Sequence, residues 1–112
     1  MHLLCTLDTL AEDVSKGFQL ADVSLVAVNK CGHIYVYLNQ CPHRGVPLEW
    51  QPDQFLDLDK NFIQCATHGA LFRIEDGECI AGPCPGEMLT KIPCKVEQGE
   101  VWINLSSLAA AI

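Results

Sequence analysis

The sequence has no long apolar run and few basic residues. Its longest apolar runs, residues 25–28 and 34–38, are far shorter than the roughly 20 residues that cross a bilayer. No Lys or Arg precedes Lys16, and Asp8 interrupts the first apolar residues, so we expect no secretory signal. Seven Lys and Arg against fourteen Asp and Glu give a formal charge of −7, which argues against a nucleic-acid surface. We therefore expect neither membrane nor nucleic-acid binding.

The cysteine content is too low for a disulfide scaffold, and the number of cysteines is odd. The chain has 112 residues, enough for one compact domain, and 49% of them are hydrophobic. Such a chain can form its core without disulfides, so we expect reduced thiols and a cytoplasmic location. The cysteines are Cys5, Cys31, Cys41, Cys65, Cys79, Cys84 and Cys94. At least one of them cannot be paired within the chain.

Helical periodicity is nearly absent, and local patterns predict short strands joined by turns. β-Branched and aromatic residues flank the turn residues 29–32, which is typical of a hairpin. Residues 6–13 are expected to form one helical turn that Lys16 and Gly17 end. Further hairpins are expected for residues 55–58 with 62–64, 70–74 with 79–81, and 89–96 with 101–105. The pattern predicts a single all-β domain, residues 1–112, built as a sandwich or partly open barrel.

Two loops at the ends of expected hairpins carry metal-ligating side chains. One contains Cys41 and His43, and the other contains Cys65 and His68. Thiolate and imidazole ligands suit zinc or an iron–sulfur centre, whereas Mg²⁺ and Ca²⁺ prefer oxygen ligands. The sequence therefore predicts a metal centre held by these four residues.

The arrangement of the four ligands favours an iron–sulfur cluster over zinc. Structural zinc sites usually take a pair of cysteines from one loop and a pair of histidines from another, whereas here each loop mixes the two. In a Rieske [2Fe–2S] centre one iron is bound by two cysteines and the other by two histidines. Cys41 and Cys65 would then bind one iron, and His43 and His68 the other. A zinc-bound structural module is the alternative.

These motifs resemble the Rieske ferredoxins that carry electrons in bacterial aromatic-ring dioxygenase systems. The resemblance extends from about residue 17 to residue 104. Its specific segments are residues 41–48, residues 65–72, the turn at Asp76 and Gly77, and Gly82 with Pro83. The resemblance implies stacked antiparallel sheets with a small cluster-binding subdomain at about residues 38–86. It also implies one [2Fe–2S] cluster and transient docking to a flavin-dependent ferredoxin reductase and a terminal oxygenase.

The same resemblance predicts a low reduction potential. High-potential Rieske proteins of respiratory complexes have an extra cysteine in each loop and two hydroxyl side chains near the cluster. This chain has Val46 and Thr67 at the cysteine positions, and Ala70 and Phe72 at the hydroxyl positions. Because hydrogen bonds to sulfur stabilise the reduced cluster, we expect a potential at the lower end of the roughly −150 to +300 mV Rieske range.

The remaining residues give weaker predictions. The loop at Gly82, Pro83 and Pro85 is expected to cap the cluster, with Cys84 as a bystander. Cys5, Cys31, Cys79 and Cys94 are expected to be small, semi-buried apolar residues. One further hypothesis is an acidic docking surface for a basic reductase, formed from Glu49, Asp53, Asp57, Asp59, Glu75, Asp76 and Glu78.

The chain lacks the signature of an independent enzyme. It has no nucleophile paired with a base and no glycine-rich nucleotide motif, so we expect an electron-transfer component of an oxidoreductase system. The favoured function is a soluble, low-potential electron carrier. The alternative within the same resemblance is a small Rieske-like subunit of an assimilatory nitrite reductase complex.

Overall fold

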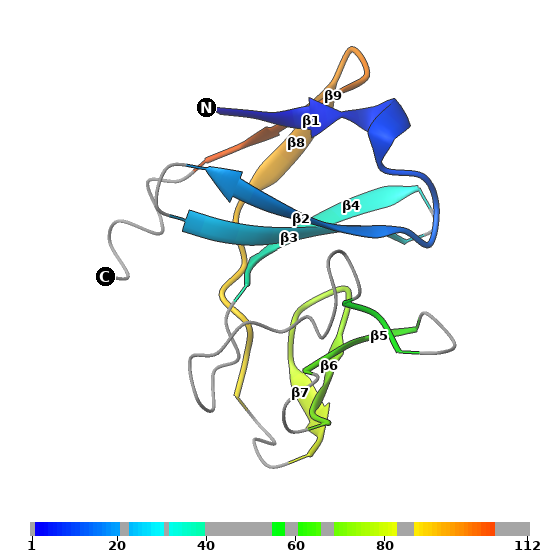
Figure 1. Ribbon diagram of the computed structural model, residues 1–112, viewed down its shortest axis with the longest axis vertical. Coiled ribbons are helices and arrows are strands. Elements are labelled where there is room, and N and C mark those ends of the chain that lie inside the picture. The colour runs from blue at the N-terminus through cyan, green and yellow to red at the C-terminus, as the bar shows by residue number, and fades with distance from the viewer. Residues whose placement is uncertain are drawn as a thin grey trace.

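The computed structural model describes residues 2–20, 23–30, 32–39, 55–57, 61–65, 69–82 and 87–104. This part of the chain forms three antiparallel sheets of three strands each (Figure 1). The elements in chain order are β1 (His2–Thr6), the 3-10 turn η1 (Leu7–Thr9), β2 (Ser15–Leu20), β3 (Val23–Lys30), β4 (His33–Leu38), β5 (Phe62–Gln64), β6 (Leu71–Arg73), β7 (Cys79–Ala81), β8 (Cys94–Glu97) and β9 (Glu100–Ile103). The predicted all-β class is confirmed.

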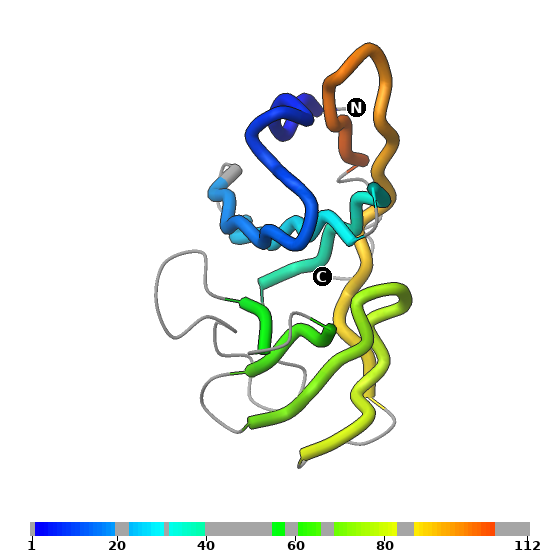
Figure 2. Tube along the Cα trace, turned by 90° about the vertical axis from the view of Figure 1, so that its right-hand side faces the viewer, coloured from blue at the N-terminus to red at the C-terminus, as the bar shows by residue number. Residues whose placement is uncertain are grey.

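The middle sheet, with strand order β2-β3-β4, separates two hydrophobic cores. Successive residues of a strand point to opposite faces. Val26 and Val28 on β3 accordingly pack into the core shared with β5, β6 and β7, whereas Leu25 and Ala27 pack into the core shared with β9. Because both faces are covered, residues 25–28 of β3 are a continuous apolar run rather than an alternating one. Figures 1 and 2 both show this sheet between the other two.

The sheet β1-β9-β8 covers the core that contains Leu25 and Ala27, to which Leu10, Ile92 and Ile103 also belong. The expected helical turn over residues 6–13 is only the three-residue η1, so that prediction was too long. Lys16 and Gly17 do not end a helix but lie inside β2, where they pair with Ala27 and Val26. The neighbouring strand β3 supplies the ladder that makes residues 15–20 a strand, and this partner is not visible in the local sequence.

The sheet β5-β6-β7 covers the core that contains Val26 and Val28, and it follows the middle sheet in the chain. The predicted hairpin 70–74 with 79–81 is present as β6 and β7. β3 and β4 also form the predicted hairpin, but β3 continues through Lys30, which pairs with His33, so the turn is shorter than the expected residues 29–32. The strand expected at 55–58 is reduced to a bridge between Leu56 and Ile63 in the described residues.

The strand expected at 89–96 begins only at Cys94, because the segment before it changes partner and forms only isolated bridges, Met88 with Glu78 and Lys91 with Tyr37. Residues 87–93 instead run along the molecule from the lower sheet to the upper one (Figure 2). Two backbone hydrogen bonds tie this segment to β4, from Leu38 N to Thr90 O at 2.9 Å and from Ile92 N to Val36 O at 2.8 Å. No helix in the described residues is long and apolar enough to cross a membrane.

Candidate metal centre

The predicted ligand Cys65 follows β5 directly and starts a tight loop. Its backbone N–H donates to Ala70 O at 2.9 Å, and Gly69 N–H donates back to Cys65 O at 2.8 Å. Gly69 has φ +70°, a left-handed conformation that suits glycine. These two hydrogen bonds hold the backbone N–H and C=O of Cys65 in place between β5 and β6.

Cys65 is fully buried, in the same core as Ile63, Ala70 and Phe72. A thiolate is the soft ligand that iron and zinc prefer, and an apolar shell that excludes water is a feature by which proteins tune such centres. Donor type and burial of Cys65 therefore fit a buried metal–thiolate centre.

A second segment approaches this loop from the end of β7. Gly82 has φ +103°, and a Cβ placed on it would lie 2.6 Å from Ala70 Cα and 3.0 Å from Ala70 Cβ. No side chain other than hydrogen fits there, because real Cβ atoms do not come so close to a backbone. The chain therefore passes against the Cys65 loop just before residue 83, where the capping loop was predicted.

The sheet that carries Cys65 is braced against the middle sheet by Tyr37. This side chain of β4 is fully buried, and its hydroxyl donates a hydrogen bond to Ile74 O in the turn after β6. Burial, followed by the negative charge of Asp76, raises the pKa of Tyr37 well above its ordinary value, so the hydroxyl keeps the proton that it donates.

The same turn leaves room for the tyrosine ring only because it contains a glycine. A Cβ on Gly77, which has φ +79°, would lie 2.8 Å from Tyr37 Cε1 and 3.3 Å from Leu89 Cβ. Leu89 N–H donates to Gly77 O at 2.9 Å. The local sequence does not reveal this brace, since Tyr37 appears there only as one aromatic residue of a strand.

Of the four predicted ligands, Cys65 lies in the described residues, whereas Cys41, His43 and His68 lie outside them. Other residues named in the sequence predictions also lie outside the described residues: Cys31, Val46, Glu49, Asp53, Asp59, Thr67, Pro83, Cys84 and Pro85. No group of three or more candidate ligand side chains is found within the described ranges. The site predicted from sequence is thus represented structurally by one ligand and its supporting loop.

Cys5 and Cys94 are semi-buried, as expected, and Cys79 is more deeply buried than expected. Cys79 is buried, and its thiol donates to Ala81 O at 3.2 Å. Cys5 and Cys94 are partly buried, and burial raises the pKa of both thiols. The Cys94 thiol donates to Ile34 O at 3.4 Å. Raised pKa values disfavour the reactive thiolate, which agrees with a packing role for Cys5 and Cys94.

Solved structures with the same fold include small ferredoxins and, over a smaller share of their length, terminal oxygenases. The terminal oxygenase of carbazole 1,9a-dioxygenase from Novosphingobium sp. KA1 is 24% identical with a TM-score of 0.76, covering 91% of this chain and 29% of that one. The ferredoxin of carbazole 1,9a-dioxygenase from Nocardioides aromaticivorans IC177 is 22% identical with a TM-score of 0.74, covering 90% of this chain and 93% of that one. The Sphingomonas yanoikuyae B1 ferredoxin is 26% identical with a TM-score of 0.73, covering 91% and 95%. A complex of reduced oxygenase and oxidized ferredoxin in carbazole 1,9a-dioxygenase contains a chain 20% identical with a TM-score of 0.74, covering 91% and 99%.

A curated relative is the cytochrome b6-f complex iron–sulfur subunit of Chlorobaculum thiosulfatiphilum, 34% identical over 71 residues. The match covers 63% of this chain, which spans only 35% of that relative's length. The family model of the Rieske [2Fe-2S] domain matches residues 1–99. The chain therefore belongs to the Rieske [2Fe–2S] domain family, so its cofactor is a Rieske [2Fe–2S] cluster and its class of function is electron transport.

Proposed function

We propose that Cys41, His43, Cys65 and His68 hold the [2Fe–2S] cluster, the cysteines on one iron and the histidines on the other. The buried thiol of Cys65, fixed by its hydrogen-bonded loop, supports this assignment. The other three residues contribute the remaining donors of a two-cysteine, two-histidine set. When bound, the cluster accepts and returns one electron. Within a single domain of residues 1–112, residues 38–86 form the cluster-binding subdomain.

The chain functions as a soluble, low-potential electron carrier in the cytoplasm, passing electrons from a flavin-dependent reductase to a terminal oxygenase. The observation that carries this proposal is the match to the Sphingomonas ferredoxin over nearly the full length of both chains. The complex of oxygenase and ferredoxin adds that a protein of this fold docks on an oxygenase in that system.

The apolar wall beside Cys65 supports a low potential. Ala70 and Phe72 are fully buried in the Cys65 core and offer no hydroxyl to a cluster sulfur. Without such donors the reduced, more negative state is stabilised less. The fully buried hydroxyl of Tyr37, in the same core, is already committed to Ile74 O.

The curated relative suggests a second candidate, an iron–sulfur subunit of a larger redox complex. The midpoint potential distinguishes the two functions, because the low-potential carrier is expected at the bottom of the Rieske range. A strongly positive midpoint at neutral pH would favour the second candidate.

The purified protein provides the direct test. We expect red-brown absorption, an EPR signal after reduction by dithionite, and two irons and two acid-labile sulfides per chain. Cys65→Ser and His68→Ala should lose the spectrum, whereas Cys94→Ser, a matched change at a partly buried cysteine, should retain it. A colourless protein that contains zinc would contradict the proposal.

A further inference from the structure

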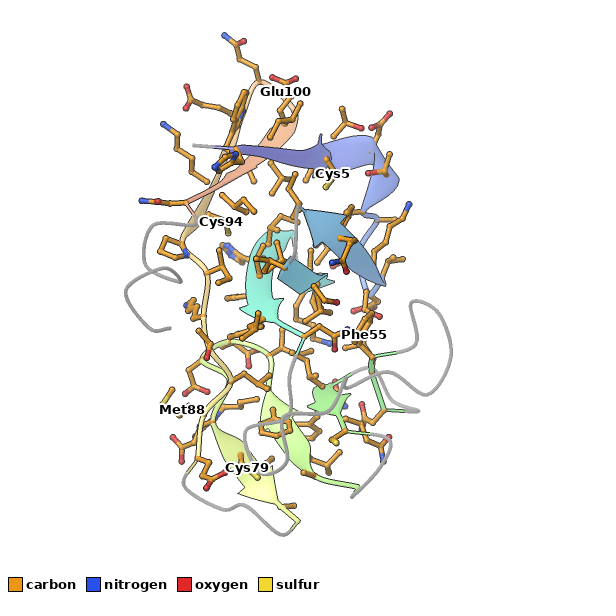
Figure 3. The ribbon with its side chains drawn as sticks, turned by 60° about the vertical axis from the view of Figure 1, so that its left-hand side comes forward. Cys5, Phe55, Cys79, Met88, Cys94 and Glu100 are labelled. Atoms are coloured by element: carbon orange, nitrogen blue, oxygen red, sulfur yellow. The ribbon has the colours of Figure 1, made fainter. Side chains whose placement is uncertain are left out.

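One end of the molecule has an exposed apolar patch on the outer side of the sheet that carries Cys65. Ile80 and Met88 are 43% and 52% exposed, which is unusual for large apolar side chains. Glu78 and Met88 are bridge partners, and Ile80 lies two residues beyond Glu78, so all three side chains share one face. We call this surface the Ile80–Met88 face. Figure 3 shows Met88 pointing away from the body of the protein.

The strand β7 is built to keep this face exposed. A β-bulge shifts its register with β6, since Leu71 pairs with Ala81 while Phe72 pairs with Cys79. One extra residue on β7 leaves both Ile80 and Ala81 exposed, although Cys79 before them is buried. The exposure of Ile80 therefore follows from the strand geometry.

Carboxylates lie close in the chain to the residues of the Ile80–Met88 face. Glu78 lies on it, Glu87 precedes Met88, and Glu75 and Asp76 form the turn before β7. Two cations lie nearby: Arg73 is held by Asp76 at 3.4 Å and Glu78 at 3.2 Å, and Lys91 Nζ donates to the backbone oxygen of Glu75 at 3.4 Å. The four carboxylates still outnumber these two cations. Among the described residues, no ion pair involves the carboxylates of Glu75 or Glu87. An apolar centre with an acidic rim is complementary to an apolar side chain ringed by Lys or Arg.

The face is also close to the proposed cluster ligand. Cys65 N–H bonds to Ala70 O, and the next residue, Leu71, pairs with Ala81 on β7. Two strand spacings therefore separate the Cys65 loop from β7, about 10 Å across the sheet. A partner seated here would lie near the redox centre.

The other two large apolar residues that are exposed in the described ranges, Leu3 and Val96, do not form such a surface. Leu3 pairs with Trp102 and Val96 pairs with Val101, and these adjacent residues of β9 point to opposite sides of their sheet. Leu3 and Val96 are each 44% exposed, so they match Ile80 and Met88 in exposure without forming one patch. They serve as matched controls.

We propose that the Ile80–Met88 face is the docking surface for a redox partner protein that presents an apolar side chain within a basic rim. The proposal rests on the proposed electron-carrier function and adds to it a location and a partner chemistry. The partner's apolar side chain would contact Ile80 and Met88, while its basic groups would face Glu75 and Glu87.

The test follows electron transfer from the dithionite-reduced holoprotein to a basic cytochrome c by stopped-flow absorbance. We expect Ile80→Ser and Met88→Ser to lower the second-order rate constant about fivefold each. Leu3→Ser and Val96→Ser should change it less than about twofold. With dioxygen, a small neutral oxidant that needs no docking surface, all four variants should react like the parent protein. Equal losses in both pairs, or a loss that also appears with dioxygen, would overturn the docking assignment.

Charge reversal provides a second test. Glu87→Lys should slow the reaction with cytochrome c about tenfold at low salt, and the effect should shrink as salt is added. Glu100→Lys makes the same change in net charge near the opposite end of the molecule (Figure 3) and should have much less effect. Equal effects would show attraction by net charge alone and would overturn the assignment. If the purified protein showed no visible absorption that dithionite bleaches, the carrier function itself would be wrong. The docking proposal, which rests on that function, would then be wrong as well.

Discussion

At the scale of single residues, Gly82 is expected to be intolerant of any side chain. Gly82→Ala places a Cβ 2.6 Å from Ala70 Cα and leaves alanine at φ +103°. The backbone of Ala70 must move, and with it the loop that holds Cys65. We expect a loss of about 1–3 kcal/mol in the free energy of unfolding beyond the conformational strain, together with a lower iron content per chain.

Gly99→Ala is the matched control for this prediction. Gly99 has φ +75°, but a Cβ placed on it would have nothing within 4 Å, so the variant suffers the strain without the collision. Denaturant unfolding and iron analysis of the two variants separate the effects. If both variants lost the same stability and the same iron, the contact with Ala70 would have no role.

Tyr37→Phe removes the hydroxyl that joins β4 to the turn after β6. Ile74 O then loses its buried hydrogen-bond donor, at a cost of about 1–3 kcal/mol in unfolding free energy. Tyr35→Phe, on the same strand, should cost much less because Tyr35 is only partly buried. Thermal unfolding followed by circular dichroism measures the difference, and equal losses would show that the bond to Ile74 does not brace the sheet.

The raised pKa of Tyr37 also predicts a dependence of stability on alkaline pH. A tyrosine whose pKa is higher in the folded state stabilises the fold fully below its unfolded pKa of about 10, and this contribution is lost as pH rises above that value. The parent protein should therefore lose more stability than Tyr37→Phe between about pH 9 and pH 11. Parallel slopes for the two proteins would contradict the prediction.

At the scale of the elements, the hairpin that leads to Cys65 depends on one carboxylate. Asp57 Oδ1 accepts hydrogen bonds from Asn61 N–H at 2.9 Å and Phe62 N–H at 3.1 Å, which fixes the start of β5. Asp57→Ala should speed amide hydrogen exchange in residues 62–64 by about fivefold, which corresponds to roughly 1 kcal/mol of local opening. Asp57→Asn keeps an acceptor oxygen and should exchange nearly as slowly as the parent. Fast exchange in both variants would show that the charge, not the acceptor, stabilises the turn.

The elements that could be predicted from the sequence are those whose cause is local. The turn residues within 29–32 and the two apolar runs beside them can be recognised from the local sequence alone. The structure has the expected hairpin there, formed by β3 and β4. β1 is mostly exposed and is a strand because β9 pairs with it, almost a hundred residues away. Its pattern could not be recognised without that partner.

In the candidate site, too, the features with a local cause could be predicted from the sequence and the long-range contacts could not. Cys65 is recognisable because the spacing of cysteine and histidine is a local motif. The contact between Gly82 and Ala70 and the brace from Tyr37 to Ile74 join segments that are distant in sequence. Gly82 stands out in the sequence as part of a loop, but the reason for glycine there is the backbone of Ala70 and appears only in three dimensions.

At the scale of the whole molecule, the two cores on either side of the middle sheet differ in their relation to the site. Among the residues that the structure describes, the core next to β9 contains no proposed ligand, whereas the core next to β6 contains Cys65. The strands β3 and β4 of the middle sheet contribute side chains to both cores. A change in the upper sheet can therefore alter the stability of the protein without reaching the residues around the ligand.

The net charge of the chain predicts how the midpoint potential of the cluster responds to salt. The chain has a formal charge of −7, and reduction of the cluster adds one more negative charge. The existing carboxylates repel the incoming electron, which lowers the midpoint potential at low ionic strength. Because the Debye length falls from about 30 Å at 0.01 M to about 3 Å at 1 M, added salt should raise the midpoint on the order of a few tens of millivolts. Redox titration at the two salt concentrations measures this shift, with Glu97→Gln and Glu100→Gln as variants of smaller charge. A midpoint that falls with salt would mean that local groups, not the net charge, control the potential.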